Sequence, residues 1–450
     1  MKIISAAMTV LLLLSGCSSK ANTSKDTSKF RSPDWAKNTT IYEVNVRQYT
    51  KEGTFKAFEN HLSRLKELGV DTLWFMPINP ISKEKRQGTL GSYYAVQNYK
   101  EVNPEFGTID DFKELVNKCH SMGFKVIIDW VANHTGWDNP WIKNKDWYLQ
   151  NEKGEIVSPP GLNWDDVAQL NYNNKDMRKT MLEDMEYWIK DINIDGFRCD
   201  HAEGVPVDFW EEARAALDKI KPVYMLAEDD TKPEFLDKAF NTNYGFDLYK
   251  TMNGIAANSS SVASLESSID KIKDDYSKGA YPLLFTSNHD ENSWNGTEYE
   301  RLGGAVKTMA ALTYVVPGVP LIYTAQEFGM NKRLKFFEKD QIEEKKSDMA
   351  DLYKKLNKLR KDNKALWNYD GDKKVTYLEG SNADVFTIVR EKDGNTVIGV
   401  FNFTNKKINS KIKFDNLKGK YKDSESDQTV DLEKEQSVDL EAWGFKIYTK

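Results

Sequence analysis

The sequence predicts a (β/α)8 TIM barrel with an insertion after strand 3 and a C-terminal antiparallel β domain. Three observations support this fold class. Short apolar runs alternate with segments of helical apolar spacing over residues 41–362, as in a parallel sheet with helices outside it. The interval between the third and fourth strands is about 40 residues longer than one strand-plus-helix unit. After residue 366, short alternating strands separated by Gly, Asn and Asp turns replace the helical spacing.

The first half of the predicted barrel holds four strands and three helices. Each strand is a compact apolar run, and each helix has apolar residues three or four positions apart. Gly69 ends the first helix, and Pro77 and Pro80 follow the second strand. In chain order we expect a strand at 41–47, a helix at 55–68, a strand at 72–76, a helix at 109–122, a strand at 124–130, a helix at 175–191 and a strand at 192–197.

The second half continues this alternation. Eight strands are reached only if one is placed at 244–248 (YGFDL). The catalytic barrel is then expected to cover residues 38–365, and a β-sandwich domain residues 366–450. In chain order we expect a helix at 208–219, a strand at 223–227, the strand at 244–248, a helix at 262–278, a strand at 282–287, a helix at 300–314, a strand at 319–324 and a helix at 347–362.

The long interval predicts an inserted subdomain over residues 135–172. The insertion leaves the C-terminal end of its strand, on the face where barrel active sites lie, so it can form one wall of a cleft. Alternatively, its aromatic residues pack only among themselves as a structural flap, and the sequence leaves both arrangements open. These aromatic residues are Trp137, Trp141, Trp147, Tyr148 and Trp164.

The N-terminus has the pattern of an export signal. A lone Lys2 precedes an apolar stretch too short for a spanning helix. The sequence LSGC that ends at Cys17 resembles the bacterial lipobox, which implies a signal peptide over residues 1–17 and lipidation of Cys17; the alternative is an ordinary cleaved signal with an incidental cysteine. Residues 18–37 are rich in Ser, Thr and Lys and predict a flexible tether. We therefore expect an exported lipoprotein anchored to a membrane, at the cell surface or in the periplasm.

Charge and cysteine content exclude several classes of protein. The 63 Lys and Arg residues against 69 Asp and Glu residues give a net charge of −6, which offers no global attraction for nucleic acid. The two cysteines beyond Cys17, Cys119 and Cys199, make no disulfide framework, and we expect both to be small buried residues.

Three acidic residues stand at the ends of predicted strands: Asp200, Glu228 and Asp290. Their spacings of 28 and 62 residues correspond to about one and two strand-plus-helix units. Because the ends of successive strands ring one face of a barrel, we expect these side chains to converge. Each acid could instead be a surface residue or a helix cap. Convergent carboxylates suggest glycoside hydrolysis, in which one acid attacks and another donates and removes a proton.

Four segments resemble the conserved segments of the α-amylase family of glycoside hydrolases. They are DWVANHT (129–135), GFRCD (196–200), LAE (226–228) and SNHD (287–290), in the family's order. The resemblance covers roughly residues 40–330, and the insertion and the C-terminal β domain match as well. It implies a retaining hydrolase that cleaves α-1,4-glucosidic bonds in starch, maltodextrins or related oligosaccharides through a covalent glycosyl-enzyme.

The resemblance also implies roles for the three acids. Asp200 would be the nucleophile, Glu228 the general acid and then the base, and Asp290 a third carboxylate that holds sugar hydroxyls. Arg198 lies two residues before Asp200 and so shares its face of the strand, where it can keep that carboxylate charged. Glu228 has no basic residue within its own strand, which leaves room for the raised pKa that a general acid needs.

Further residues are expected to bind the sugar at the cleavage site. The resemblance implies hydrogen bonds from His134 and His289, although either could be an ordinary core histidine. It also implies that Tyr93 in GSYYAVQNY stacks under the same sugar, with Tyr94 as the competing choice.

The sequence departs from the family pattern at three places. The family's calcium site would use Asn133, but Gln169 stands where an aspartate is expected, and calcium prefers several charged oxygens; Asn133 could instead only fix its loop. The segment after Asp200 lacks the Lys–His pair of many starch-cleaving members. Leu90 and Gly91 replace an aspartate that clamps the terminal glucose in several exo-acting α-glucosidases, which favours an enzyme that cuts within chains or tolerates longer ones.

Other functions compete with α-1,4-glucan hydrolysis. An α-1,6-cleaving, cyclodextrin-cleaving or transglycosylating relative stays open. A non-catalytic glucan-binding lipoprotein, or an accessory subunit of a transporter, is disfavoured because all three acids are present. The expected partners are an α-glucan or maltooligosaccharide and, through Cys17, a membrane.

Overall fold

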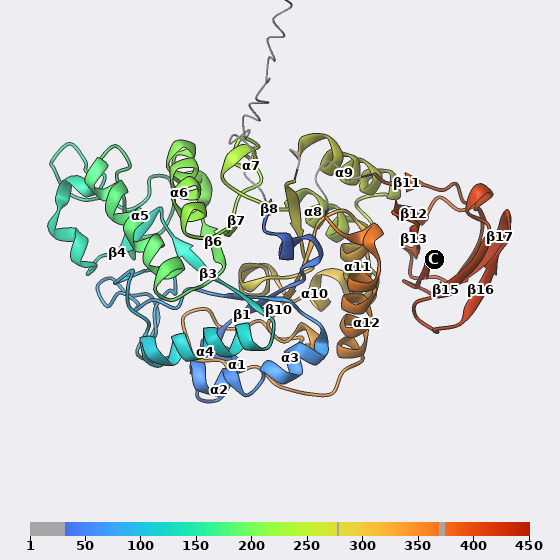
Figure 1. Cartoon of the computed structure of the whole chain (residues 1–450), viewed down its shortest axis with the longest axis horizontal. Helices are drawn as coiled ribbons and strands as arrows, with labels where there is room; N and C mark the ends of the chain where they lie inside the picture. The colour runs from blue at the N-terminus through green and yellow to red at the C-terminus, as the bar shows by residue number, and fades with distance from the viewer. Residues whose placement is uncertain (1–31, 277–278, 369–373) are drawn as a thin grey trace, which may run out of the picture.

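The fold is a closed barrel of eight parallel strands, in a computed structural model that describes residues 32–276, 279–368 and 374–450. The spatial order is β1-β10-β9-β8-β7-β6-β3-β2, and β1 pairs with both β10 and β2, which closes the barrel (Figure 1). The predicted barrel is therefore confirmed. The strands are β1 (Ile41–Val44), β2 (Thr72–Phe75), β3 (Lys125–Val131), β6 (Gly196–Asp200), β7 (Tyr224–Ala227), β8 (Thr242–Tyr244), β9 (Tyr281–Leu284) and β10 (Val319–Tyr323).

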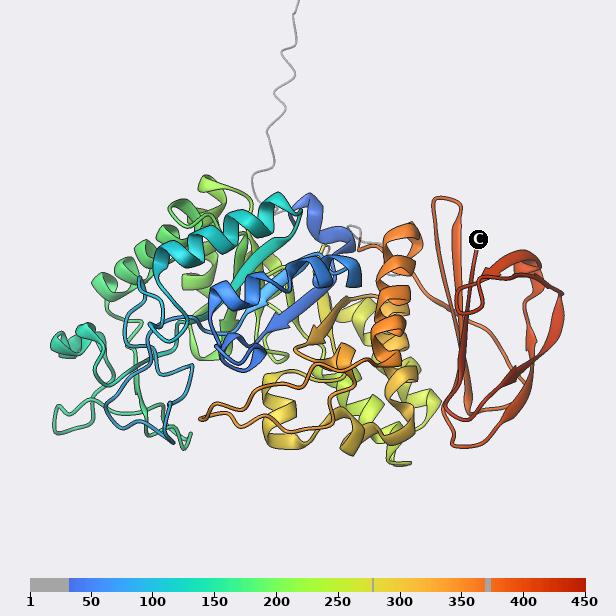
Figure 2. The ribbon, with the colours of Figure 1, turned by 90° about the horizontal axis from the view of Figure 1, so that it is seen from below.

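Helices surround the barrel (Figures 1 and 2). Local signals fix several of their ends: Thr108 and Asp111 form a reciprocal capping box at the start of α4, and Gly69, with φ of 91°, ends α3. The helices are α1 (Val46–Tyr49), α2 (Phe55–Glu59), α3 (Leu62–Leu68), α4 (Ile109–Ser121), α5 (Lys175–Lys190), α6 (Val207–Ile220), α7 (Phe235–Lys238), α8 (Phe246–Ala256), α9 (Val262–Asp275), α10 (Glu298–Leu302), α11 (Val306–Val315) and α12 (Asp348–Asp362).

Two predicted strands are shifted in the structure. The strand placed at 244–248 is wrong, because β8 ends at Tyr244 and α8 starts at Phe246. Buried residues of α8, such as Leu248 and Met252, are four positions apart, so a helix buries them together where a strand would not. The strand placed at 192–197 begins only at Gly196, which makes Asp200 its last residue.

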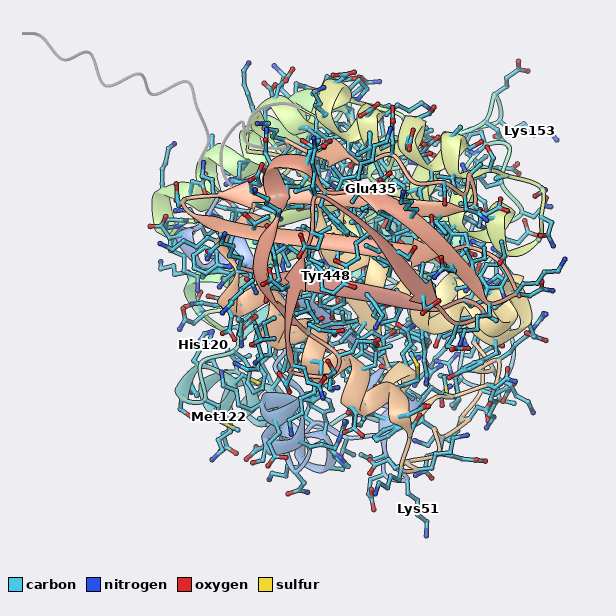
Figure 3. The ribbon with its side chains drawn as sticks, turned by 90° about the vertical axis from the view of Figure 1, so that its right-hand side faces the viewer. Lys51, His120, Met122, Lys153, Glu435 and Tyr448 are labelled. Carbon is cyan, nitrogen blue, oxygen red and sulfur yellow. The ribbon has the colours of Figure 1, made fainter. Side chains whose placement is uncertain are left out.

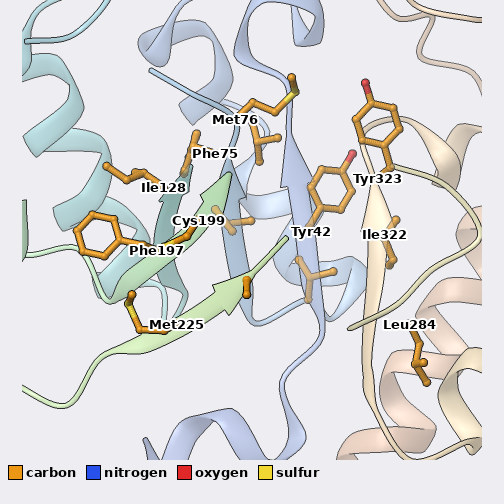
Figure 4. Packing of buried hydrophobic residues seen from close by; sticks show 14 of the residues in the cluster. Tyr42, Phe75, Met76, Ile128, Phe197, Cys199, Met225, Leu284, Ile322 and Tyr323 are labelled. Atoms are coloured by element: carbon orange, nitrogen blue, oxygen red, sulfur yellow. The ribbon is translucent and has the colours of Figure 1, made fainter. Parts of the chain in front are cut away.

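The core follows the two-residue period of the strands. In β3, Ile127 packs inside the barrel and Ile128 packs towards the helices; in β7, Leu226 and Met225 divide in the same way. Figure 4 shows the outward set, which includes Phe197 and Cys199 of β6. Cys119 and Cys199 are buried free thiols, as predicted. The same alternation turns Arg198 and Asp200 inwards together.

The insertion is built on a short antiparallel pair, β4 (His134–Gly136) with β5 (Val167–Gln169). Both predicted arrangements of its aromatic residues occur. Trp141 packs against Trp147 and against Tyr99, with ring centroids 5.3 and 4.9 Å apart, and so serves the structure. Trp164 lines a cavity instead.

The C-terminal strands form two antiparallel sheets that enclose a small core of their own, with Val400, Ile412 and Val438 among its members. One sheet has the order β11-β12-β13-β18-β15-β16 and the other pairs β14 with β17. Figure 3 views these strands face on, with Tyr448 and Glu435 labelled. The strands are β11 (Thr376–Tyr377), β12 (Val385–Lys392), β13 (Asn395–Asn402), β14 (Ile408–Lys413), β15 (Gly419–Asp423), β16 (Thr429–Leu432), β17 (Glu435–Leu440) and β18 (Phe445–Thr449).

Helices α11 and α12 lie between the barrel and these sheets (Figure 1). The Arg390 side chain of β12 is buried and donates a hydrogen bond to the Val315 carbonyl at the end of α11, over 3.0 Å. The C-terminal strands thus brace the helical layer rather than the open end of the barrel.

The expected signal peptide, the lipidation residue Cys17 and most of the expected tether lie outside the described residues. The predicted tether extends too far along the chain: residues 34–38 form a 3-10 helix, and the Trp35 ring packs 5.6 Å from that of Tyr224. Within the described ranges, no helix combines the length and apolar character that crossing a membrane requires.

Candidate active site

The three predicted acids line one cavity of about 580 Å³ at the C-terminal ends of the barrel strands. Asp200 is the last residue of β6, Glu228 directly follows β7, and Asp290 follows β9 by six residues. The strand positions therefore predicted their convergence correctly. Asp200 is buried, whereas the side chains of Glu228 and Asp290 are 22% and 39% exposed and so open to a ligand.

Arg198 is the electrostatic centre of the site. Its Nη1 lies 2.9 Å from Asp200 Oδ1 and 2.8 Å from Asp129 Oδ1, and its Nη2 lies 2.9 Å from Glu228 Oε1. The guanidinium is fully buried, and Nε donates a hydrogen bond to the Tyr244 hydroxyl over 3.2 Å. One buried cation thus serves three carboxyl groups.

Two of the three acids beside Arg198, Asp200 and Glu228, differ in proton affinity, in the direction opposite to our prediction. Burial, followed by the negative charge of Glu228, raises the pKa of Asp200 well above its usual range. Burial also raises the pKa of Glu228, but Arg198 and the backbone N–H of His201, 2.8 Å from Oε2, bring it below its usual value. The expectation of a raised pKa for Glu228 is wrong because the basic partner comes from the neighbouring strand, which a search along β7 alone does not find.

His289 adds a second cation to the site. Its Nδ1 lies 2.5 Å from Glu43 Oε1, and its Nε2 lies 2.6 Å from the Tyr94 hydroxyl and 3.3 Å from Asp290 Oδ2. Burial lowers the pKa of His289, but the carboxylates of Asp290 and Glu43 raise it to about 9. The imidazolium form therefore dominates near neutral pH and orients Asp290.

Tyr94, and not Tyr93, lines the cavity in the described part of the chain. Its ring stacks on His289 with centroids 5.5 Å apart, and its hydroxyl donates to Asp129 Oδ2 over 3.1 Å. The Tyr93 hydroxyl donates to Asn45 Oδ1 instead, and the Arg47 guanidinium covers its ring. The choice of Tyr93 is therefore wrong; adjacent tyrosines in a loop have no period that tells which one faces the ligand.

Several aromatic side chains form the walls of the cavity. Trp294 is the most exposed of them, at 52%, and its ring lies 5.2 Å from that of Phe336. Phe336 in turn stacks nearly parallel to Tyr94 at 6.2 Å. These faces suit the apolar faces of sugar rings. Sequence reasoning missed Trp294, which stands in a five-residue π-helical turn, and Phe336, which stands on a loop. The adjacent pair Phe336-Phe337 was the available signal. The aromatic lining residues are Tyr94, Trp164, Phe246, Trp294, Phe336 and Phe337.

Two buried acids of the site were also missed. Asp129, two residues before the end of β3, receives hydrogen bonds from Arg198, Tyr94 and the Trp74 indole N–H, the last over 3.3 Å. Glu43 of β1 holds His289. Both acids could have been found from the sequence, because each is a carboxyl group within an otherwise apolar strand. Burying such a group without a partner is costly, so each acid must have a hydrogen-bonding or charged partner inside the barrel.

The residues around Asn133 do not fit a calcium ion. The Gln169 amide nitrogen lies 2.9 Å from Asn133 Oδ1, as a hydrogen-bond donor in the place of a charged oxygen ligand. Among the residues that the structure describes, no group of three or more His, Cys, Asp or Glu side chains could hold a metal. We assign no step to calcium.

Comparison with known proteins identifies the family. The alpha amylase catalytic domain matches residues 19–373. The chain belongs to the alpha-amylase family. It is 25% identical over 391 residues to an alpha-amylase of Haloarcula japonica, covering 83% of this chain but 56% of that enzyme. It is 24% identical over 478 residues to a maltogenic alpha-amylase of Bacillus acidopullulyticus, covering 93% and 78% of the two chains.

A solved structure agrees with this assignment. The noncanonic maltogenic alpha-amylase of Thermotoga neapolitana superposes with a TM-score of 0.83 at 26% identity, over 92% of this chain and 98% of that one. The predicted family is confirmed, and this alpha-amylase family member is a glycoside hydrolase.

Proposed function

We propose that this protein hydrolyses α-1,4-glucosidic bonds in starch, maltodextrins or related oligosaccharides and retains the anomeric configuration. The observation that carries the proposal is the cavity in which Asp200, Glu228 and Asp290 converge, with Arg198 bridging the first two. Paired carboxyl groups on either side of a scissile bond are what a covalent, two-step glycosidase requires.

In the proposed first step, the Asp200 carboxylate attacks the anomeric carbon while Glu228 gives its proton to the departing glycosidic oxygen. In the second step, the Glu228 carboxylate takes a proton from water, and the water oxygen attacks the anomeric carbon and releases Asp200. The anomeric carbon is inverted twice, so the product keeps the configuration of the substrate.

The proton that this scheme needs on Glu228 must be stabilised by the substrate. In the ligand-free protein, the pKa directions favour a proton on Asp200. A glycosidic oxygen that accepts a hydrogen bond from Glu228 favours protonated Glu228, and Arg198 then compensates the charge of Asp200 through Nη1. Arg198 contacts both acids, so the proton can change sides without leaving an uncompensated carboxylate.

The substrate is expected to be a neutral sugar chain. The ionisable side chains that line the cavity, within the described residues, are acids and two histidines, together with the Tyr94 hydroxyl, and neither Lys nor Arg is among them. A cavity of this composition repels phosphorylated or acidic sugars. Its aromatic walls favour several linked glucose units, and the maltogenic relatives support an α-glucan.

The test is a product analysis with an anomer assay. Purified protein is given maltoheptaose, soluble starch, pullulan, panose and cyclodextrins, alongside Asp200→Asn and Glu228→Gln. We expect release of α-anomers, detected by proton NMR before mutarotation, from maltoheptaose and starch, and a loss of at least about 1,000-fold in each variant. Initial release of β-anomers contradicts retention. Products that arise only from cleavage of the α-1,6 bonds of panose and pullulan contradict the α-1,4 assignment. Action on cyclodextrins alone, whose bonds are all α-1,4, contradicts the preference for open chains, and an inert wild type contradicts hydrolysis.

We also propose that the protein is exported and anchored through a lipid on Cys17. The LSGC sequence and the Ser-rich segment that follows support this. When the chain is expressed in a bacterium that lipidates exported proteins, Cys17→Ser is expected to move the activity from the membrane fraction to the soluble fraction. An unchanged distribution contradicts the anchor.

A further inference from the structure

Two buried amides hold each other beside the cavity. Gln169 ends β5, and Asn133 lies between β3 and β4. The Gln169 Nε2 group donates to Asn133 Oδ1 and to the Asn133 carbonyl, both over 2.9 Å, and to the Leu170 carbonyl over 3.2 Å. Asn133 Nδ2 donates back to Gln169 Oε1 over 3.1 Å. We call this pair the amide clamp.

The neighbours of the clamp fix the orientation of both amides. Two of the three oxygens around Gln169 Nε2 are backbone carbonyls, which only accept hydrogen bonds, so the atom between them must be a donor. If the Gln169 amide were flipped, its Oε1 would face these three acceptor oxygens with no proton between them. The nitrogen therefore occupies a point where oxygens converge, and such a point otherwise suits a cation.

The clamp reaches the cavity through His134. Asn133 Nδ2 lies 3.2 Å from His134 Nδ1, and His134 lines the cavity. An amide nitrogen only donates, so Nδ1 must accept, and the single proton of the neutral ring is on Nε2. Burial of His134 lowers its pKa to about 3, in agreement with a neutral ring.

The clamp also supports the loop after β6. A Cβ atom added at Gly204 would lie 2.4 Å from Asn133 Oδ1, so this loop packs directly on the clamp. The same loop contains His201, whose backbone N–H binds Glu228 over 2.8 Å. Two sides of the cavity therefore rest on one pair of amides.

We propose that Gln169 is a positioning residue that takes the place of a cation at this point and, through Asn133, holds His134 with its proton on Nε2. The enzyme then needs no calcium at the clamp. The part that concerns His134 rests on the proposed function and on the hydrogen bond to the sugar that the family resemblance implies for this ring; the part that concerns calcium does not.

The test compares wild type with Gln169→Glu, which keeps the shape of the side chain but replaces the donor with an acceptor. Gln150→Glu is the matched control, because Gln150 lies in the same insertion and is exposed. Melting temperatures are measured in EDTA and in millimolar CaCl2, at pH 5 and pH 8.

We expect the wild type and Gln150→Glu to melt at the same temperature with EDTA and with CaCl2. Gln169→Glu should melt about 3 °C or more lower in EDTA at pH 8 and should recover in CaCl2, because a carboxylate among three oxygens needs a cation. The deficit should shrink at pH 5, where the introduced carboxyl group, once protonated, can still donate one hydrogen bond.

Two further measurements separate positioning from structural support. ¹⁵N NMR of labelled wild-type protein should show the neutral His134 ring protonated on Nε2. In Gln169→Glu without calcium, kcat/KM for maltoheptaose should fall about 10-fold and return with CaCl2, while Gln150→Glu stays at the wild-type value.

Three results would overturn the inference: a wild-type melting temperature that falls in EDTA and is restored by CaCl2, a His134 ring protonated on Nδ1, or a Gln169→Glu variant that behaves like Gln150→Glu. The melting temperatures and the NMR spectrum of the wild type test the inference even if Gln169→Glu does not fold. The melting and NMR arms use no substrate, so they are independent of whether α-1,4 hydrolysis is correct.

Discussion

Replacement of Arg198 by methionine should change the pH dependence of catalysis as well as its rate. Arg198 is fully buried and lies within 2.9 Å of Asp129, Asp200 and Glu228. Methionine keeps much of the volume and removes the charge. The three carboxyl groups then lose their common cation, and each binds protons more tightly.

The expected magnitude follows from those contacts. An opposite charge at such a distance lowers a carboxyl pKa by about 1–3 units, so its loss should move the acid limb of the kcat/KM profile upwards by about 1–3 pH units. Below that limb, the ionised fraction of Asp200 and the rate should fall by about 10- to 1,000-fold. The free energy of unfolding should also decrease, by about 3–5 kcal/mol near neutral pH.

The assay is a pH profile of kcat/KM for maltoheptaose, with urea unfolding measured in parallel. Arg360→Met is the control, since Arg360 is also fully buried but donates to the carbonyls of Leu366 and Gly318. It should cost stability without moving the acid limb. An Arg198→Met profile with lower rates and an unshifted limb would refute the proposed electrostatic role of Arg198.

Three further variants test other parts of the structure. Burial raises the pKa of Glu298 from 4.5 to about 7. Between these two pH values the folded state therefore keeps a proton that the unfolded state has lost. The stability that this proton contributes is fully present below pH 4.5 and is lost as the pH rises to about 7. Glu298→Gln should remove this dependence, up to about 3 kcal/mol between about pH 4 and pH 8 in urea unfolding, and an equal dependence in both proteins contradicts it. Tyr94→Phe should lower kcat about 10-fold by removing the hydroxyl contacts to Asp129 and His289, whereas Tyr93→Phe should not; equal effects contradict the assignment. Trp294→Ala should raise KM for maltoheptaose about 3- to 10-fold with little change in melting temperature, and an unchanged KM excludes this ring from binding.

The sequence was sufficient to predict the barrel because its strands are almost entirely buried and read as apolar runs. It failed at β8, where only Thr242–Tyr244 pair with their neighbours and the next apolar residues belong to a helix. A strand of three residues is too short for its period to be recognised. The break between α2 and α3 was also missed. The apolar residues keep their helical spacing across Asn60 and His61, so the spacing does not reveal that the helix is interrupted there.

For the site, the sequence predicted which acids converge but not which groups set their protonation. Asp200, Glu228 and Asp290 follow from strand ends, which the chain order specifies. The contact between Arg198 and Glu228 crosses from β6 to β7, and the contact between His289 and Glu43 joins residues 246 positions apart. Such contacts depend on how far side chains from different strands extend across the barrel. A single sequence contains no pattern from which these contacts could be predicted.

The balance of charge in the cavity has one more consequence. Five carboxyl groups in or beneath the cavity, those of Glu43, Asp129, Asp200, Glu228 and Asp290, meet two cations, Arg198 and His289, so the carboxyl groups outnumber the cations even with a proton on Asp200. A neutral sugar gains little from this excess of negative charge. A sugar ring that carries a positive charge gains much more, even when that charge lasts only for the moment of bond cleavage. Basic amino-sugar mimics should therefore be stronger inhibitors than neutral glucose analogues of the same size.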